Sequence, residues 1–130
     1  MSTQNNKSLP PHNAEAEKAT LGALILNPRA LYSVVPVVNA TDFYSEKNRK
    51  VYEAIIALHS AGESCDPVTL DERLTRFSAN GVAWIDYIGE LVEYTPDEEA
   101  ATDYARIIAE KATRRRMLAA SSKIAELAHE

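Results

Sequence analysis

The sequence has few of the residues on which enzyme chemistry usually depends. Its four glycines are too scattered to form a phosphate-binding loop, and it contains neither GxxxxGK(S/T) nor GxGxxG. The histidines His12, His59 and His129 lie far apart in the chain, with no carboxylates at the spacing of metal ligands. No serine lies in a nucleophile elbow, and Cys65 stands in a polar stretch without a histidine beside it. We therefore expect no catalytic residue, no cofactor site and no metal site in this segment.

The chain also lacks long apolar runs and paired cysteines. No apolar stretch reaches the length that crosses a bilayer, and the N-terminal MSTQNNKSLPPHN is polar, unlike a secretory signal. The single Cys65 cannot form an intramolecular disulfide, which fits a reducing compartment. These absences predict a cytoplasmic protein that does not contact a membrane.

Positive charge is scarce as well. The formal net charge of -5 and the pI of about 5.2 argue against an electrostatic hold on nucleic acid by this segment, so a protein partner is expected instead. The local exception is Arg114, Arg115 and Arg116, preceded by Lys111. Consecutive helical residues point about 100° apart, so this run cannot form one flat basic patch. It is either a solvated helix surface or a contact for a protein or nucleic acid.

What is present is a composition typical of a helical globular domain. At 130 residues, with 45% hydrophobic and 25% charged residues, the chain has the size of one domain and is rich in helix formers. We expect residues 1–12 to be a disordered tail and residues 13–94 to form a compact all-α head. Start and stop signals predict about five helices there. The first is capped by Asn13 and has Gly22 at a close helix contact, and the second begins at Asn27 and Pro28 and is limited by Pro36. The third runs from Ser45 to Gly62, the fourth begins at Asp66 and Pro67, and a turn at Asn80 and Gly81 leads into the fifth.

The predicted core consists of apolar residues at helical spacing on these five helices. The run VVPVV at residues 34–38 is rich in β-formers and could be a strand, but no second strand is available to pair with it, so we predict a helix. The core residues are Ala14, Leu21, Leu24 and Ile25; Leu31, Val34 and Val35; Val51, Tyr52, Ile55, Ile56, Leu58 and His59; Leu70, Leu74 and Phe77; and Trp84, Ile85, Ile88, Leu91 and Val92.

The strongest start signal in the sequence is TPDEE at residues 95–99. Thr95 is the expected cap, Pro96 takes the first helical position, and the acidic residues that follow complement the helix dipole. Nothing breaks the pattern before Ala128, so we predict a helix of about 33 residues and about 50 Å. Because this length exceeds that of the head, residues 95–130 should project beyond it.

The apolar residues of the long helix fall on two opposite faces. The first half can close the core, while no helix of this chain remains to cover the second half. Another subunit or a downstream helix would supply the cover; the alternative is a break near Thr113 and Arg114 that folds the second half back. The first set is Ala101, Tyr104, Ile107 and Ile108, and the second is Met117, Ala120, Ile124, Leu127 and Ala128.

Four motifs in order resemble the N-terminal domain of the bacterial replicative DNA helicase, the DnaB family. They are LPPHNAEAEKATLGALIL at residues 9–26, DFYSEKNRKVYEAIIAL at residues 42–58, DPVTL at residues 66–70 and TPDEEAATDYARIIAEKATRRRML at residues 95–118. Two positions depart from the family pattern, which often has a histidine at Asn48 and a Gly-Gly before an aromatic where this chain has NGVAW at residues 80–84. Both departures are expected on the surface of the head.

The resemblance implies that the full protein is a hexameric, ATP-driven helicase that unwinds DNA at the replication fork. It further implies an all-helical head whose long helix begins a helical hairpin, with a linker and an ATPase motor domain downstream. ATP and Mg would bind in that motor domain, and DNA would pass through the parent ring rather than bind this acidic segment. The implied partners are a second copy of the domain, primase and a helicase loader.

Assembly and primase binding are therefore the leading hypothesis, with no catalysis in this segment. One alternative is a free-standing helicase-like domain that modulates or inhibits a host replicative helicase, and another is a small enzyme, which no constellation of residues supports. The dimer and primase contacts are expected on the second half of the long helix. The predicted apolar anchors are Met117, Leu118, Ile124 and Leu127, with Arg115 and Arg116 as the polar rim.

Overall fold

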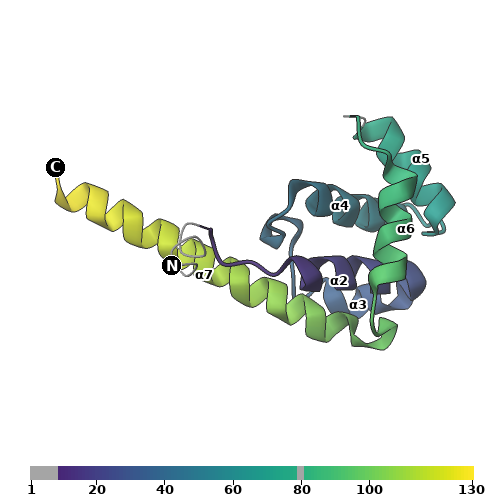
Figure 1. Cartoon of the computed structure of the whole chain (residues 1–130), viewed down its shortest axis with the longest axis horizontal. Helices are drawn as coiled ribbons and strands as arrows, with labels where there is room; N and C mark the ends of the chain where they lie inside the picture. Colours follow the sequence, from purple (N-terminus) through teal and green to yellow (C-terminus); the bar gives the residue numbers. More distant parts are fainter. Residues whose placement is uncertain (1–8, 79–80) are drawn as a thin grey trace, which may run out of the picture.

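Every regular element in the described part of the chain is helical (Figure 1). The computed structural model describes residues 9–78 and 81–130, so residues 1–8 of the predicted tail and Asn80 of the predicted turn lie outside it. The all-α class predicted from the sequence is confirmed. The elements are α2 (Ala14–Leu26), η1 (Pro28–Ala30), α3 (Leu31–Val34), η2 (Ala40–Asp42), α4 (Glu46–Ser60), α5 (Pro67–Phe77), α6 (Trp84–Tyr94), η3 (Glu98–Ala100) and α7 (Ala101–Ala128), where η denotes a 3-10 helix.

Local signals set most of the helix ends. The Asn13 side chain accepts a hydrogen bond from the Ala16 N–H at 2.9 Å, and the Ser45 hydroxyl accepts one from the Asn48 N–H at 3.3 Å. Asp66 forms a capping box at the start of α5. Gly62 follows α4 with a φ of 72°, a left-handed conformation that a glycine adopts without strain. These predicted boundaries are confirmed.

The start of the long helix differs from the prediction. Thr95 ends α6 rather than capping α7, and its hydroxyl donates to the Leu91 carbonyl at 2.9 Å. Asp97 instead accepts a hydrogen bond from the Glu99 N–H and caps the short helix η3, so α7 begins only at Ala101 and has 28 residues. The TPDEE segment therefore starts a short 3-10 helix instead of α7, because the Asp97 carboxylate accepts a hydrogen bond from the backbone N–H two residues ahead.

Several residues predicted to lie in the core are exposed. The segment after Asn27 forms only η1 and the single turn α3, which leaves Val35 on the surface. Phe77 and Ile85 face solvent at the end of α5 and the start of α6, and Ile107 is partly exposed on α7. These residues have the same helical spacing as their buried neighbours, but no other helix of the described chain packs over them.

Helix α2 forms the centre of the head, which consists of α2 to α6. It contacts α4, α6 and α7, and Leu21, Ala23 and Leu24 are completely buried. A helix that is apolar on all sides is buried on all sides. At Gly22 the backbone of α6 comes so close that an added Cβ would lie 2.3 Å from the Leu91 carbonyl oxygen. The predicted close helix contact at Gly22 is confirmed.

Helix α7 starts in the core and continues beyond the head, as Figure 1 shows. Its buried residues are Ala101, Ala105, Ile108 and Ala112, and none of its residues beyond Ala112 is buried. We call residues 113–128 the arm. The helix is unbroken through Thr113 and Arg114, so the alternative of a chain folded back at this point is wrong. At 1.5 Å per residue the helix is about 42 Å long. Within residues 9–78 and 81–130, no helix combines the length and the apolar character needed to span a membrane.

We predict that Gly22→Ala destabilises the protein by about 2 kcal/mol, because the added methyl group requires α2 and α6 to separate. Gly89→Ala is the matched control, since a Cβ at this exposed position in α6 meets nothing within 4 Å. The control substitution should raise the free energy of unfolding by about 0.5 to 1 kcal/mol, because alanine has a higher helix propensity than glycine. Urea unfolding followed by circular dichroism measures both free energies, and equal effects of the two substitutions would contradict the close contact.

Candidate interaction surface

The arm carries a group of exposed large apolar side chains. Met117 is 65% exposed, Leu118 54%, Ile124 67% and Leu127 54%. At about 100° per residue, Met117 and Ile124 lie on the side of α7 opposite Ile108 and Ala112, while Leu118 and Leu127 lie at the two edges of this side, about 180° apart. The structure thus places the four predicted anchors together on the projecting part of one helix. We call Met117, Leu118, Ile124 and Leu127 the arm face.

The arm face continues into an open groove where the N-terminal segment meets α7. The groove has a volume of about 400 Å³ and a mostly apolar lining. Its walls are formed by Met117, Leu118, Arg114 and Ser121 from α7 and by Pro11 from the segment before α2. A surface built from the sequence of the helix alone would have missed Pro11, which is more than 100 positions away from its neighbours in the groove.

Arg115 and Arg116, the predicted polar rim, contact the head. Arg115 donates one hydrogen bond to the Pro11 carbonyl at 2.8 Å and another to the Asp42 carbonyl. Arg116 donates to the Asp42 carboxylate at 3.1 Å, and this carboxylate also accepts the Asn39 N–H in the capping box of η2. The two arginines therefore join the root of the arm to the head. Sequence reasoning missed Asp42 because nothing local pairs it with a residue 74 positions later.

An aromatic stack lies beside these arginines. The rings of His12 and Tyr44 are stacked with their centroids 4.2 Å apart, and the Arg115 guanidinium lies 5.5 Å from the centre of the Tyr44 ring. A cation within about 6 Å of an aromatic face is attracted to it. Residues 9–13 therefore contact the head through His12 and α7 through Pro11.

A buried polar network fixes the turn that carries Asp42 and Tyr44. The Glu17 carboxylate of α2 accepts the Tyr44 N–H at 2.7 Å and the Asn48 side-chain amide at 2.9 Å. The Tyr87 hydroxyl of α6 donates to the Asn48 side-chain oxygen. Burial, followed by the nearby charges of Glu90 and Glu17, raises the pKa of Tyr87 to about 12, so the hydroxyl keeps its proton. The expectation that position 48 lies on the surface is wrong, because Asn48 is buried as the link between Glu17 and Tyr87.

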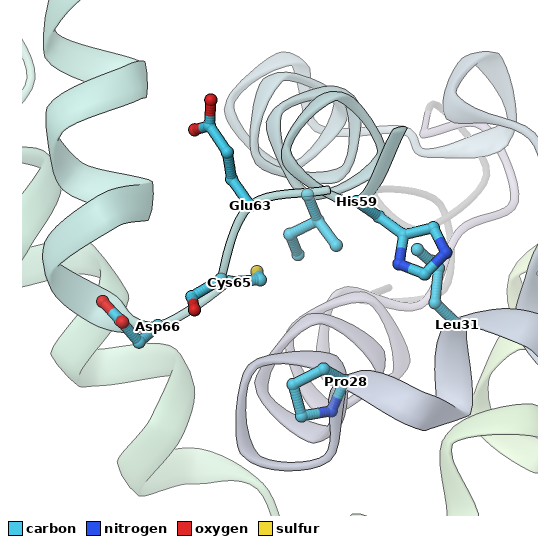
Figure 2. Close-up of a pocket in the computed structure, with 8 residues that line it drawn as sticks. Pro28, Leu31, His59, Glu63, Cys65 and Asp66 are labelled. Atoms are coloured by element: carbon cyan, nitrogen blue, oxygen red, sulfur yellow. The ribbon is translucent and has the colours of Figure 1, made fainter. Parts of the chain in front are cut away.

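A second hollow, of about 380 Å³, lies between η1, α4 and α5 (Figure 2). It holds His59, Glu63, Cys65 and Asp66, and in the figure the Glu63 carboxylate points away from the Cys65 sulfur. Burial, with the neighbouring Asp66 charge, raises the pKa of the Cys65 thiol to about 11, so the reactive thiolate is rare at neutral pH. Asp66 is already engaged as the cap of α5. In the described residues no three His, Cys, Asp or Glu side chains come together as a metal site.

The head, the arm and the arm face define an all-helical domain with a projecting helix that exposes several large apolar side chains. Residues 9–110 match the family model of the DnaB-like helicase N terminal domain. The chain belongs to this family, as the sequence motifs predicted.

Curated relatives and solved structures agree with the family assignment. The chain is 37% identical over 121 residues to the replicative DNA helicase DnaB of Leifsonia xyli and 35% identical over 122 residues to the replicative DNA helicase DnaC of Bacillus subtilis. These matches cover 92% and 93% of this chain but 26% and 27% of the relatives, so the chain spans about a quarter of their length.

Two solved structures share the fold. The N-terminal domain of DnaB helicase from Mycobacterium tuberculosis has a TM-score of 0.89 and 31% identity, with 94% of this chain and 89% of that chain covered. The N-terminal domain of DnaB helicase from Helicobacter pylori has a TM-score of 0.75 and 19% identity, with 89% and 91% covered; it is described together with its interactions with primase.

We predict that Asp42→Ala destabilises the protein by about 1 to 3 kcal/mol, because a buried capping residue and the partner of Arg116 are lost together. The control is Glu110→Ala, which removes the exposed partner of Arg114 on the same helix and should cost less than about 0.5 kcal/mol. Thermal unfolding of both variants compares the two contacts. A loss for Asp42→Ala no larger than that of the control would show that Asp42 does not anchor the arm.

Proposed function

We propose that this chain is the assembly and partner-binding domain of a replicative DNA helicase. The observation that carries the proposal is the arm face, whose large apolar side chains are more than half exposed on the part of α7 that projects beyond the core. Full burial of each such side chain stabilises an assembly by about 1.5 to 3 kcal/mol. Several large apolar side chains exposed together on one projecting segment are typical of a protein interface.

The charges along α7 favour a second copy as one occupant of the arm face. The root carries Lys111 and three arginines, of which Arg114 pairs with Glu110, and the tip carries Glu126 and Glu130 beside Lys123, so the root is positive on balance and the tip negative. Two arms that run antiparallel would place the positive root of one beside the negative tip of the other, so the ends attract while the apolar faces meet. A symmetric pair of this kind uses the same patch on both copies.

In the proposed domain organisation, residues 13–94 form the head and residues 95–130 the long helix that begins a helical hairpin. The linker and the ATPase motor domain would follow downstream, which agrees with relatives about four times as long as this chain. ATP and Mg would bind in the motor domain, and DNA would pass through the hexameric ring of the parent protein. Unwinding of duplex DNA at the replication fork then belongs to the parent, and this domain organises the ring.

Primase is the second proposed partner of the arm, and a helicase loader is a third. The support for primase is the Helicobacter pylori domain, which shares this fold and is described with its interactions with primase. The exposed apolar anchors of the arm face are the kind of residue that dominates the energy of such contacts.

The double substitution Ile124→Glu with Leu127→Glu tests the proposed assembly. It should abolish self-association, because a charge placed in an apolar interface must be desolvated without a partner. The helix should persist, since both residues are exposed and glutamate is a good helix former. Sedimentation equilibrium measures the association, and far-ultraviolet circular dichroism measures the helix content.

The matched control is Ala119→Glu with Ser122→Glu, which adds the same charge to exposed positions on the side of the arm opposite Met117 and Ile124. The control should associate like the wild-type chain. A double variant of Ile124 and Leu127 that still associates normally would reject the arm face as the interface.

Binding of primase from the same organism provides a separate prediction. The Ile124 and Leu127 double variant should lose primase binding in isothermal titration calorimetry, while the Ala119 and Ser122 control retains it. Full primase affinity in the first variant, together with lost self-association, would restrict the arm face to assembly and place primase elsewhere on the domain.

A further inference from the structure

Helix α7 is held to the head along one narrow side. At 100° per residue its buried residues lie within about 60° of one another, and they are Ala101, Ala105, Ile108 and Ala112. This packing fixes how α7 is turned about its own axis. Alanine side chains are single methyl groups, however, and form only low ridges against a neighbouring helix. Packing of this kind gives little resistance to a sideways swing of the arm, which begins directly after Ala112.

Two arginines lie on either side of this packed line, one turn further along α7. At 100° per residue, Arg115 is about 50° to one side of the line and Arg116 about 50° to the other. Arg115 donates a hydrogen bond to the Asp42 carbonyl, and Arg116 donates one to the Asp42 carboxylate at 3.1 Å. The root of the arm is therefore attached to the same turn of the head from both sides.

The turn that both arginines bind is itself attached to the core. The buried Glu17 carboxylate of α2 accepts the Tyr44 N–H at 2.7 Å, two residues after Asp42. Asp42 is buried too, and its carboxylate also accepts the Asn39 N–H at 2.9 Å. A contact from the arm to this turn is therefore connected to the centre of the head.

Residues 9–13, which we call the strap, add a third segment to these contacts. The Pro11 carbonyl accepts a second hydrogen bond from Arg115, at 2.8 Å. The next residue, His12, stacks its ring on Tyr44 with the centroids 4.2 Å apart. The Arg115 guanidinium therefore joins the strap and the turn to α7. We call the four residues that make the hydrogen bonds the clasp: Pro11, Asp42, Arg115 and Arg116.

We infer that the clasp restrains the sideways swing of the arm and holds it at one angle to the head. Without the clasp, the last point at which α7 is held is Ala112. Ser122 lies about 15 Å further along the helix, so each 10° of swing about Ala112 would move it by about 3 Å.

The angle of the arm has a consequence for assembly, and this part of the inference rests on the proposed function. If the arms of two copies meet, each head is placed relative to the other through its own arm. A clasp that holds the arm at one angle then also sets the distance between the heads. The clasp residues would act as positioning residues of the assembly, separate from the arm face that forms the contact.

The first test measures the swing within one chain. Nitroxide labels on the exposed positions Glu53→Cys of α4 and Ser122→Cys of the arm, in a Cys65→Ser background, report the head-to-arm distance by pulsed electron spin resonance. Labelled chain is diluted into an excess of unlabelled chain, so that only distances within one chain are recorded. Arg115→Ala with Arg116→Ala should broaden the distance distribution by about 3 Å or more, which corresponds to about 10° of swing.

The matched control is Arg106→Ala with Arg114→Ala, which removes the same charge from the same helix. These two arginines pair with Asp103 and Glu110 of α7 itself, so the control should keep the wild-type distance distribution. Far-ultraviolet circular dichroism checks that every variant keeps its helix content. Equal distributions for the clasp variant and the control would overturn the inference.

A second pair of variants tests the strap. His12→Ala removes the ring that stacks on Tyr44, whereas His12→Phe keeps an aromatic ring at this position. His12→Ala should broaden the head-to-arm distribution, because the strap then loses the contact that holds Pro11 beside Arg115, and His12→Phe should restore the wild-type width. An unchanged distribution in His12→Ala would exclude the strap from the clasp.

The third test measures the assembly. A single label at Glu53→Cys reports the distance between heads in the associated chain, and the Arg115 and Arg116 double variant should broaden this distance as well. Its dissociation constant in sedimentation equilibrium should stay within about twofold of that of the Arg106 and Arg114 control, since both variants lose the same charge and neither changes the arm face.

The outcomes separate the clasp from the proposed function. Narrow head-to-head distances beside a broadened head-to-arm distance would refute a role of the clasp in the geometry of assembly. A monomeric wild-type chain would reject the proposed function, and the link to assembly would fall with it. The head-to-arm comparison would still decide whether the clasp holds the arm, because it is made within one chain.

Discussion

The close approach of α2 and α6 at Gly22 is the constraint on which the rest of the structure depends. Helix α2 is the shared neighbour of α4, α6 and α7, so its place in the head sets theirs. Only a residue without a side chain allows the Leu91 carbonyl of α6 to lie where it does. The Thr95 hydroxyl occupies the same space and bonds to that carbonyl, which ends α6 and redirects the chain toward α7. The direction of the arm is therefore fixed by a contact at the centre of the head.

Two carboxylates hold the turn between η2 and α4 in a fixed place relative to the core and to the arm. Glu17 accepts the Tyr44 N–H from the side of α2, and Asp42 accepts Arg116 from the side of α7. Both carboxylates are nearly buried, and both also satisfy groups of their own surroundings, Asn48 for Glu17 and the Asn39 N–H for Asp42. Buried acidic groups are tolerated when each oxygen has a donor. The acidic pair thus explains how one short turn can connect a core helix to a projecting one.

Local patterns predicted the features that depend on a few neighbouring residues. The caps at Asn13 and Ser45 and the left-handed Gly62 follow from backbone chemistry within one turn of helix. The apolar arm face was predicted from periodicity, which needs only the residues of α7. The contacts of Arg115 and Arg116 could not be predicted in this way. Their partners Pro11 and Asp42 lie more than 70 positions away, and only the packing of α7 against the head brings them together. Thr95 and Phe77 were misassigned for the same reason, since tertiary contacts decide which of several local options a residue takes.

Helix α7 carries different kinds of side chain on its two halves. The head-facing side of its first half carries mainly small residues, Ala101, Ala105 and Ala112, which let the helix lie close to α2. The arm, beyond this packed half, carries the large exposed residues of the arm face. Because the helix is continuous, any rotation of the arm about its axis would have to be accompanied by rotation of the packed first half. The orientation of the arm is therefore determined by alanine packing about 20 to 30 Å away. In the proposed assembly, this packing would also set how the heads are arranged around the arms.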